Sequence, residues 1–260
     1  FIEESFFKNF FKQRDKSSNK GTFGHVLVIG GSKNMSGAIN LAGLSAYKTG
    51  CGLVTLCVPK CISNTLKKKF PESVFIEIPN NVDGLTMDES CFIDEIKQKL
   101  MKKPSAIVIG PGMTNRNGLL KLIKDALRYF DCPIILDADA LNLISKDLSI
   151  IKKCKQQIIL TPHPGEMARI SQNSIKDIQK NRISIAKEIS AITKAITILK
   201  GNRTIISSPK GETYINSSGN EGMATGGMGD SLTGIIASFI AQGYNPLEAS
   251  ILGVFVHGKA

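Results

Sequence analysis

Short apolar runs alternate with longer amphipathic stretches along most of this chain. Runs such as "HVLVIG", "LVTLCV" and "AIVIG" are continuously apolar and rich in β-branched residues, which is typical of buried strands. Seven strands are expected, at residues 25–30, 53–58, 74–78, 106–110, 133–137, 157–161 and 195–200, with helix-like stretches at 36–50, 88–103, 117–130 and 178–193. Because strands that alternate with helices form a parallel sheet covered on both faces, the pattern predicts a three-layer α/β/α fold with a mostly parallel central sheet.

The alternation changes after residue 200. The runs "RTIISS" and "ETYIN" are separated by "PKG", which favours a hairpin, and a glycine-rich loop then leads into two helices at about 228–241 and 246–258. At the other end, "FIEESFFKNFFKQRDK" has apolar residues at helical spacing, so we expect a short helix over residues 1–14 that docks on the domain or on a partner subunit. No linker, repeat or low-complexity tract interrupts the chain, which favours one domain over residues 1–260.

The basic charge balance leaves several classes of partner open. There are 33 Lys and Arg against 22 Asp and Glu, a net charge of +11 that suits nucleic acid, anionic nucleotides or only a solvated basic surface. The lysines are dispersed and no aromatic residues are interleaved with them, so a solvated surface is favoured over a nucleic-acid face. The six cysteines form no CxxC pair, which argues against zinc and suits a reducing cytoplasm. No apolar run reaches about 18 residues, so no membrane span is expected.

The stretch "NEGMATGGMGDSLTGIIASFIAQG" places Gly226, Gly227 and Gly229 directly before an apolar helical pattern. Glycines at a helix start let main-chain N–H groups point at an anion, which predicts a phosphate cradle. Asp230 beside it could take a proton from an attacking hydroxyl. The alternative is a plain turn in which Asp230 only stabilises the first helical turn. No Walker loop and no GxGxxG after a strand is present, since the nearest string, "GVFVHGKA", lacks the required hydroxyl.

Several predicted strands end in glycine or polar residues, as in "VLVIGGS", "IVIGPGM", "IILDADALN" and "IILTPHPGE". Because ligands of open α/β sheets bind outside the carboxyl ends of the strands, we expect the site along this edge. Each motif keeps a structural alternative: "TPHPGE" as a helix cap with Pro164 in the first turn, and "KGNRT" as a turn with solvated Lys200 and Arg203 rather than a phosphate contact. In "DADALN", one acid could position water or Mg²⁺, whereas Asp139 could only cap the next helix.

Taken in order, "KGTFGHVLVIGGSKNMSGAINLAGLSAYKTGCGLVTL", "IVIGPGM", "ILDADALNLI", "LTPHPGEMARI", "LKGNRTII" and the glycine stretch resemble the NAD(P)H-hydrate dehydratases, over roughly residues 20–258. The resemblance implies a ribokinase-like fold without the lid of that superfamily. It also implies a cytoplasmic repair enzyme, a hydro-lyase that acts on NADH or NADPH hydrated on the nicotinamide ring. A nucleotide would phosphorylate the ring hydroxyl, and loss of phosphate would restore the double bond.

The resemblance also assigns roles to residues. The hydrated cofactor would be contacted by Ala38, Gly112, His163 and Asp230, with Asp230 as the base. The phosphate donor would be held by Lys200, Gly201, Asn202, Arg203, Thr204, Gly226, Gly227 and Gly229. The donor is ADP or ATP and Mg²⁺ is implied, with no metal ligand assigned. A homo-oligomer, often a tetramer, and an epimerase fused to the chain or working with it are also implied.

Other functions stay open at this point. A ribokinase-like kinase acting on a vitamin precursor or sugar would need the same glycine loop and the same Asp230, although "HPGE" and "MSGA" favour the dehydratase. A nucleic-acid-binding protein without catalysis would bind with a steep salt dependence. An inactive nucleotide sensor would bind ADP without turnover.

Overall fold

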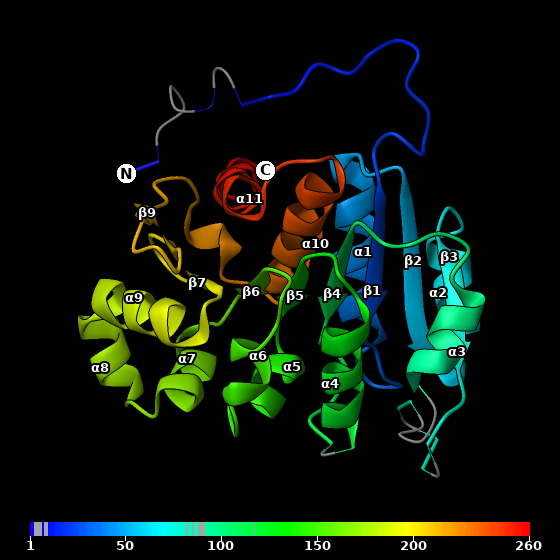
Figure 1. The fold of residues 1–260 in the computed structure, drawn as a ribbon, viewed down its shortest axis with the longest axis horizontal. Coiled ribbons are helices and arrows are strands. Elements are labelled where there is room, and N and C mark those ends of the chain that lie inside the picture. Colours follow the sequence, from blue (N-terminus) through cyan, green and yellow to red (C-terminus); the bar gives the residue numbers. More distant parts are fainter. Residues whose placement is uncertain (3–6, 8–9, 82, 85, 88–91, 117) are drawn as a thin grey trace.

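A computed structural model describes residues 1–260 except 3–6, 8–9, 82, 85, 88–91 and 117. Its described strands form a nine-stranded sheet in the order β3-β2-β1-β4-β5-β6-β7-β8-β9 (Figure 1). The strands are β1 (His25–Ile29), β2 (Leu53–Pro59), β3 (Val74–Ile78), β4 (Ala106–Ile109), β5 (Ile134–Leu136), β6 (Ile158–Leu160), β7 (Ile196–Leu199), β8 (Ile205–Ser207) and β9 (Thr213–Ile215). The first seven pair in parallel and the last two antiparallel. The predicted strands, the hairpin and the mostly parallel sheet are therefore confirmed.

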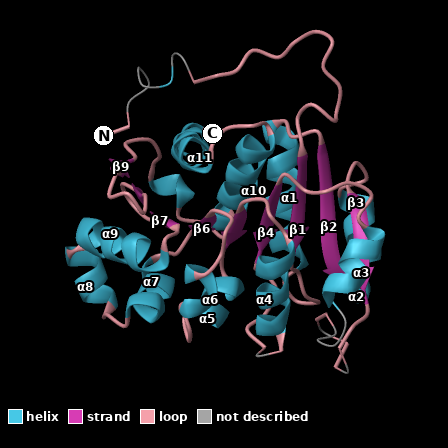
Figure 2. Ribbon diagram, in the orientation of Figure 1, coloured by secondary structure: helices cyan, strands magenta, loops and turns pink. Residues whose placement is uncertain are grey.

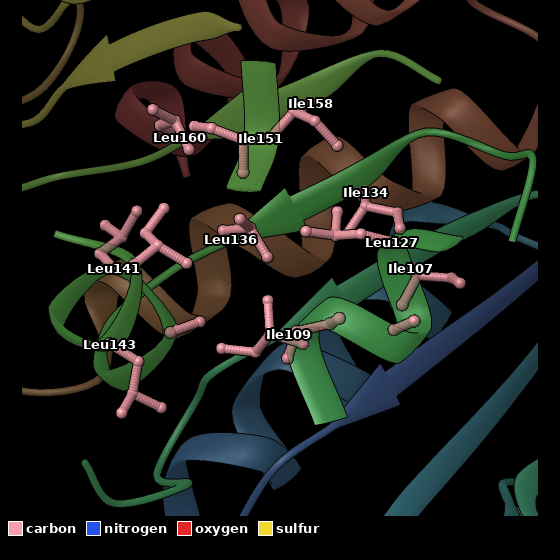
Figure 3. Close-up of a cluster of buried hydrophobic side chains, with 14 of the residues drawn as sticks. Ile107, Ile109, Leu127, Ile134, Leu136, Leu141, Leu143, Ile151, Ile158 and Leu160 are labelled. Atoms are coloured by element: carbon pink, nitrogen blue, oxygen red, sulfur yellow. The ribbon is translucent and has the colours of Figure 1, made fainter. Parts of the chain in front are cut away.

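Helices cover both faces of this sheet (Figure 2). They are α1 (Ser36–Thr49), α2 (Lys60–Lys69), α3 (Phe92–Lys99), α4 (Leu119–Tyr129), α5 (Asp139–Ile144), α6 (Ser149–Lys152), α7 (Pro164–Ser171), α8 (Ile175–Lys180), α9 (Arg182–Thr193), α10 (Met228–Ala241) and α11 (Pro246–Lys259). Alternate residues of each strand face opposite sides, so Val26 and Val28 pack with α1, α2, α10 and α11, while Leu27 and Ile29 pack with α3 to α9. Figure 3 shows the second core around β4, β5 and β6. The three-layer prediction is confirmed.

Two of the helices arise from a break that the sequence pattern does not show. The stretch expected as one helix at 178–193 is α8 and α9, which meet at Asn181. Asn181 lies outside helical geometry, with φ −123° and ψ 34°, and ends one helix while it begins the other. Arg182, the first residue of α9, directly follows this break.

The first residues pack as predicted, but their described part shows helical geometry only at Phe7, which lies in a 3-10 turn. Residues 3–6 and 8–9 of the expected helix over 1–14 lie outside the described residues, and residues 11–14 form no helix. Residues 10–24 instead lie across the molecule above α10 and α11 before the chain enters β1 (Figure 1), and polar groups of this stretch bond to distant loops. The Lys12 N–H, for example, donates to the Tyr244 hydroxyl at 2.9 Å. The Phe7 ring stacks on Phe255, with 4.4 Å between centroids.

No described helix has both the length and the apolar content needed to cross a bilayer.

Candidate active site

The edge formed by the carboxyl ends of the parallel strands also receives the first turn of α10. The helix begins after Gly227, whose φ is +91°, and a side chain there would overlap Leu41 of α1. A Cβ at Gly229 would lie 3.0 Å from Lys200 Nζ, whereas one at Gly226 would meet no atom within 4 Å. Within the described chain no side chain caps this turn, so its N–H groups are open to an anion.

Asp230 is the third residue of α10 and is partly buried. Burial and the nearby negative charge of Asp137 together raise the pKa of Asp230 to about 6, although the positive charge of Lys200 opposes them. A carboxylate with a pKa close to neutral can accept a proton efficiently at the pH of most cells. The predicted base therefore lies at the open N-terminus of a helix, beside a cation.

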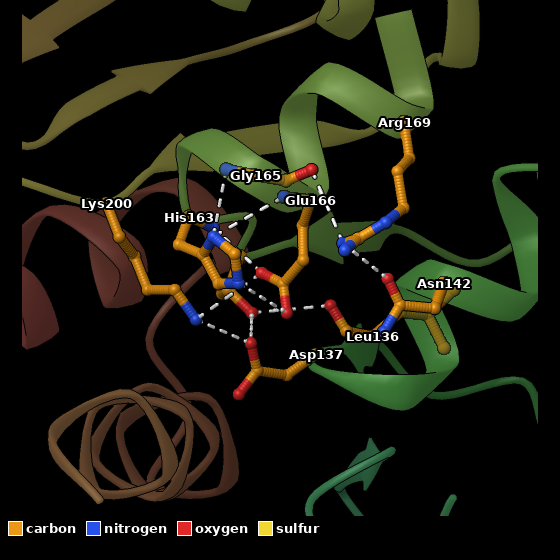
Figure 4. A network of polar contacts seen from close by, with 9 residues as sticks. Leu136, Asp137, Asn142, His163, Gly165, Glu166, Arg169 and Lys200 are labelled. Carbon is orange, nitrogen blue, oxygen red and sulfur yellow. Dashed lines mark hydrogen bonds and ion pairs between the residues drawn. The ribbon is translucent and has the colours of Figure 1, made fainter. Parts of the chain in front are cut away.

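That cation is held in a cluster of carboxylates at the ends of β5, β6 and β7 (Figure 4). Lys200 Nζ lies 2.8 Å from Asp137 Oδ1 and 4.0 Å from Glu166 Oε2. The Thr161 hydroxyl donates to the same Asp137 oxygen at 2.8 Å. Burial alone would lower the pKa of Lys200, but Asp137, Glu166 and Asp230 outweigh it and raise the pKa, so Lys200 stays charged.

Glu166 carries a second perturbed carboxyl group. Its side chain is only 6% exposed, and burial raises the pKa of Glu166 to about 7 despite the opposing charge of Lys200. Its Oε2 accepts the His163 N–H at 2.8 Å. This bond is one half of a capping box at the start of α7.

His163 supplies the other half of that box. Its Nδ1 accepts from the Gly165 N–H at 2.9 Å and from the Glu166 N–H at 3.4 Å, and Pro164 is the first helical residue. The structural alternative for "TPHPGE" is thus confirmed. Burial and the Lys200 charge lower the pKa of His163. Because Nδ1 accepts hydrogen bonds, the proton of the neutral ring is assigned to Nε2, which lies 3.5 Å from Glu166 Oε1.

Two other residues of the predicted cofactor site contact each other. Gly112 follows β4 with φ +63°, and a Cβ there would lie 3.2 Å from that of Ala38 in α1 and would overlap the Met35 carbonyl. The close approach explains why this position carries glycine. The structure therefore brings Ala38 and Gly112 together where α1 meets the end of β4.

The loop at 200–204 joins β7 to β8, and its side chains point to two different places, the carboxylate cluster and a surface cleft. Lys200 points inward to Asp137 (Figure 4), and its N–H donates to the Pro162 carbonyl at 2.9 Å. Asn202 and Arg203 are exposed and line a cleft of about 660 Å³ with residues of α8 and α9. The ammonium that was expected to reach phosphate is thus already paired with a carboxylate.

Three residues of the cluster received no definite role from sequence: Thr161, Asp137 and Glu166. Asp137 was weighed only as a water or Mg²⁺ position, and Glu166 only as part of a cap. Asp137 and Thr161 directly follow β5 and β6, and Glu166 lies in the first turn of the next helix, α7. The rule that ligands bind at the carboxyl ends of the strands was therefore the signal that could have identified them. The closeness of Lys200 to them depends on β7 lying next to β6, which local sequence does not encode.

The described residues contain no group of three or more His, Cys, Asp or Glu side chains arranged to hold a metal ion. Mg²⁺ commonly takes most of its ligands from substrate phosphates and water. The carboxylates present therefore fit an ion that arrives with a nucleotide better than one held by a protein cage.

Comparison with known proteins gives a consistent picture. A family model described as NAD(P)H-hydrate dehydratase matches residues 26–260. The chain is 39% identical over 248 residues to the bifunctional NAD(P)H-hydrate repair enzyme Nnr of Moorella thermoacetica, covering 95% of this chain and 46% of that protein. It is 38% identical over 258 residues to the ADP-dependent (S)-NAD(P)H-hydrate dehydratase of Neisseria meningitidis serogroup B, covering 98% and 81%. The chain thus spans about half the length of the bifunctional relatives it matches.

Solved structures agree with this match. The ADP/ATP-dependent NAD(P)H-hydrate dehydratase of Bacillus subtilis, co-crystallised with ATP/Mg²⁺, superposes with a TM-score of 0.81 at 33% identity over 96% of this chain and 83% of that one. Ribokinase of Thermotoga maritima superposes at 0.57 with 15% identity over 90% of this chain and 92% of that one, a likeness of fold alone. The predicted ribokinase-like fold is confirmed.

Proposed function

The chain belongs to the NAD(P)H-hydrate dehydratase family, and we propose that it restores NADH or NADPH from the form hydrated on the nicotinamide ring, at the expense of ADP or ATP. The observation that carries this proposal is the position of Asp230, a partly buried carboxylate at the open N-terminus of α10 and near the Lys200–Asp137 pair. The names of the relatives support the substrate, and this geometry supports the chemistry.

In the first step Asp230 accepts the proton of the ring hydroxyl. The hydroxyl oxygen then bonds to the terminal phosphorus of the donor, and the bridging P–O bond breaks, so that ADP leaves as AMP or ATP leaves as ADP. The N–H groups of the first turn of α10 stabilise the negative charge on the phosphoryl oxygens in transit, with Gly226, Gly227 and Gly229 keeping the backbone accessible. Mg²⁺ bound to the nucleotide would add neutralising charge on the same phosphates.

In the second step the C–O bond of the phosphorylated ring breaks, phosphate leaves with the former hydroxyl oxygen, and the neighbouring ring carbon loses a proton to water. The double bond is restored and the cofactor is reduced nicotinamide again. Ala38, Gly112 and His163 would hold the hydrated cofactor, and the loop at 200–204 would hold the donor. Because phosphate is a better leaving group than hydroxide, phosphorylation speeds the elimination, and cleavage of the phosphoanhydride bond of the nucleotide supplies the driving force.

The test is incubation of the protein with hydrated NADH, Mg²⁺ and either ADP or ATP, beside an Asp230→Asn variant. The readouts are return of the reduced-nicotinamide absorbance and release of phosphate. General-base catalysis contributes about 10²- to 10⁴-fold, so the variant should lose at least about 100-fold in rate. Nucleotide binding that persists in the variant shows that it is folded. A phosphorylated product that never yields NADH would instead identify a small-molecule kinase.

Membership of the same family also supports proposals on the compartment, the oligomeric state and the partner of the enzyme. We place it in the cytoplasm and as a homo-oligomer, with a tetramer as the expected state. Because the bifunctional relatives are about twice as long as this chain, an epimerase that is fused to it or acts beside it is the expected partner. Size-exclusion chromatography with light scattering tests the tetramer.

A further inference from the structure

The first residue of α9 contacts the loop that links β7 to β8. Arg182 Nη2 donates to the Leu199 carbonyl at 3.1 Å and to the Lys200 carbonyl at 3.3 Å, and Nη1 donates to Gln179 Oε1 at 3.2 Å. The two carbonyls are the last of β7 and the first of the loop at 200–204. One planar guanidinium thus ties the end of a central strand to the end of α8.

Gly201 completes the contact. Its φ of +133° suits glycine, and an added Cβ would lie 3.1 Å from Arg182 Nη1. The guanidinium therefore packs directly against the loop backbone at the residue that follows the two bonded carbonyls. Arg182 is half-buried and forms no ion pair with any described residue, so its hydrogen-bonding capacity is directed at main-chain carbonyls and one amide.

The contact has a consequence for the active site. The side chain of Lys200 leads to Asp137, and the space above Gly229 is filled by Lys200 Nζ. A shift of the Lys200 carbonyl would move this ammonium relative to the first turn of α10. Arg182 itself lines the cleft that Lys187 and Arg203 also line.

We propose that Arg182 is a positioning residue for nucleotide binding: it holds the Leu199 and Lys200 carbonyls, and through them fixes the loop at 200–204 in the conformation that receives the donor phosphates. The inference rests on the proposed function, because it takes the loop as the nucleotide site. Arg182 touches neither substrate nor reacting atoms, so its loss acts on nucleotide affinity more than on the chemical step.

The experiment compares Arg182→Gln, Arg182→Lys and Lys187→Gln in the full chain. Lys187 is the matched control, because it lies on the same helix and lines the same cleft, and Lys187→Gln removes the same charge without touching the loop carbonyls. The measurements are the Kd for ADP by calorimetry, KM for the nucleotide and kcat, and amide hydrogen exchange of peptides covering 199–204 in the unliganded protein.

Arg182→Gln should raise Kd and KM for the nucleotide about tenfold, the effect of losing one charged hydrogen-bond donor, and leave kcat within about twofold. Exchange in the 199–204 peptides should speed up in this variant. Arg182→Lys, which keeps the charge but cannot bridge both carbonyls, should fall between it and wild type, and Lys187→Gln should match wild type.

Equal effects in Arg182→Gln and Lys187→Gln would overturn the proposal, because the cleft would then act by charge alone. Unchanged exchange together with unchanged affinity would also overturn it. If wild-type protein fails to bind ADP, the proposed function fails, while the exchange measurement still decides whether Arg182 holds the loop. If Arg182→Gln does not fold, Arg182→Lys carries the same comparison.

Discussion

At the scale of single residues, Asp230 owes its basicity to its surroundings. Burial and the negative charge of Asp137 raise its pKa to about 6, and Lys200 opposes the shift. As the base of the first step it must be ionised, so kcat/KM should fall as the pH drops through about 6 with a slope of one proton. A pH–rate profile between pH 5 and 8 checks this.

Lys200→Met provides the control for that assignment. Because Lys200 lowers the pKa of Asp230, its removal should move the inflection of the profile to higher pH, on top of any loss in rate. An inflection that stays in place in Lys200→Met would mean that another group controls the profile.

Glu166 makes a prediction about stability rather than rate. Its pKa rises from 4.5 to about 7 on folding, so between these values the folded state binds more protons than the unfolded state, and stability falls as the pH rises through this window. Glu166→Gln keeps an acceptor for the His163 N–H but cannot ionise. It should match wild type near pH 4.5 and be more stable at pH 8, by up to about 3 kcal/mol. Urea unfolding at both pH values measures the difference.

Glu77 is the contrasting carboxylate. Its hydrogen bonds from Lys67 and Ser63 lower the pKa of Glu77, so this group stabilises the fold at high pH and loses that effect on acidification. Glu77→Gln should therefore not stabilise the protein at pH 8. Stabilisation by both substitutions alike would show that charge removal on a surface, not burial of Glu166, is responsible.

The sequence could identify some site residues and not their partners. Asp230 and the glycines before it stand in one short stretch, so their role as base and cradle could be proposed from spacing alone. The Lys200–Asp137 pair joins residues 63 positions apart, and only the order of β5, β6 and β7 brings them together. The sequence left two interpretations of His163 open, because the same residue type can cap a helix or contact a ligand. The structure shows that His163 caps α7.

At the scale of elements, the strands were predictable because each is short, apolar and buried. Val26 to Ile29 are fully buried from both sides, as the continuous run indicates. The starts of α5 and α7 were weighed only as structural alternatives at Asp139 and Pro164, and α6 was not predicted, because four to eight residues are too few to show a helical period. The break at Asn181 was missed because the apolar spacing continues across it.

The packing of α1 against α10 gives a prediction at this scale. Gly234 lies in α10, and a Cβ there would overlap the Ala42 carbonyl of α1. Gly234→Ala should destabilise the protein by about 1–3 kcal/mol, because two buried helices must move apart. Gly37, near the start of α1, has no atom within 4 Å of an added Cβ, so Gly37→Ala should be neutral or stabilise by up to about 1 kcal/mol. Thermal unfolding of the two variants makes the comparison, and equal losses would contradict the close helix contact.

At the scale of the whole molecule, the nine described strands form one sheet. The assignment of residues 1–260 to a single domain stays a prediction. The expected helix over 1–14 was inferred from apolar spacing, but the polar residues Lys12 and Arg14 near its end bond to residues more than 200 positions away. The spacing of apolar residues indicates which side chains can share one face of a helix, but it does not identify hydrogen-bond partners that are distant in the sequence. The buried Ile2 and Phe7 show that the docking interpretation was sound for the described residues.

Arg14 is the clearest of these long-range contacts. Its Nη2 donates to the Gly50 carbonyl at 2.7 Å and to Gln242 Oε1 at 3.0 Å, and its guanidinium lies 3.9 Å from the centroid of the Phe23 ring. Arg14→Ala should lower the free energy of unfolding by about 1–2 kcal/mol. The exposed Lys16 serves as control, and Lys16→Ala should stay within about 0.5 kcal/mol of wild type in the same urea titration. Equal effects would mean that the segment contributes only charge.

The central claim is that the ring hydroxyl leaves as part of a phosphate group. Hydrated NADH prepared in ¹⁸O-water carries the heavy isotope in that hydroxyl, and the phosphate released during turnover with ADP or ATP can be analysed by mass spectrometry. Phosphoryl transfer to the hydroxyl followed by elimination predicts that each NADH formed is matched by one phosphate carrying one ¹⁸O atom. Unlabelled phosphate, with the ¹⁸O lost to water, would contradict the mechanism and remove Asp230 from its role as the base.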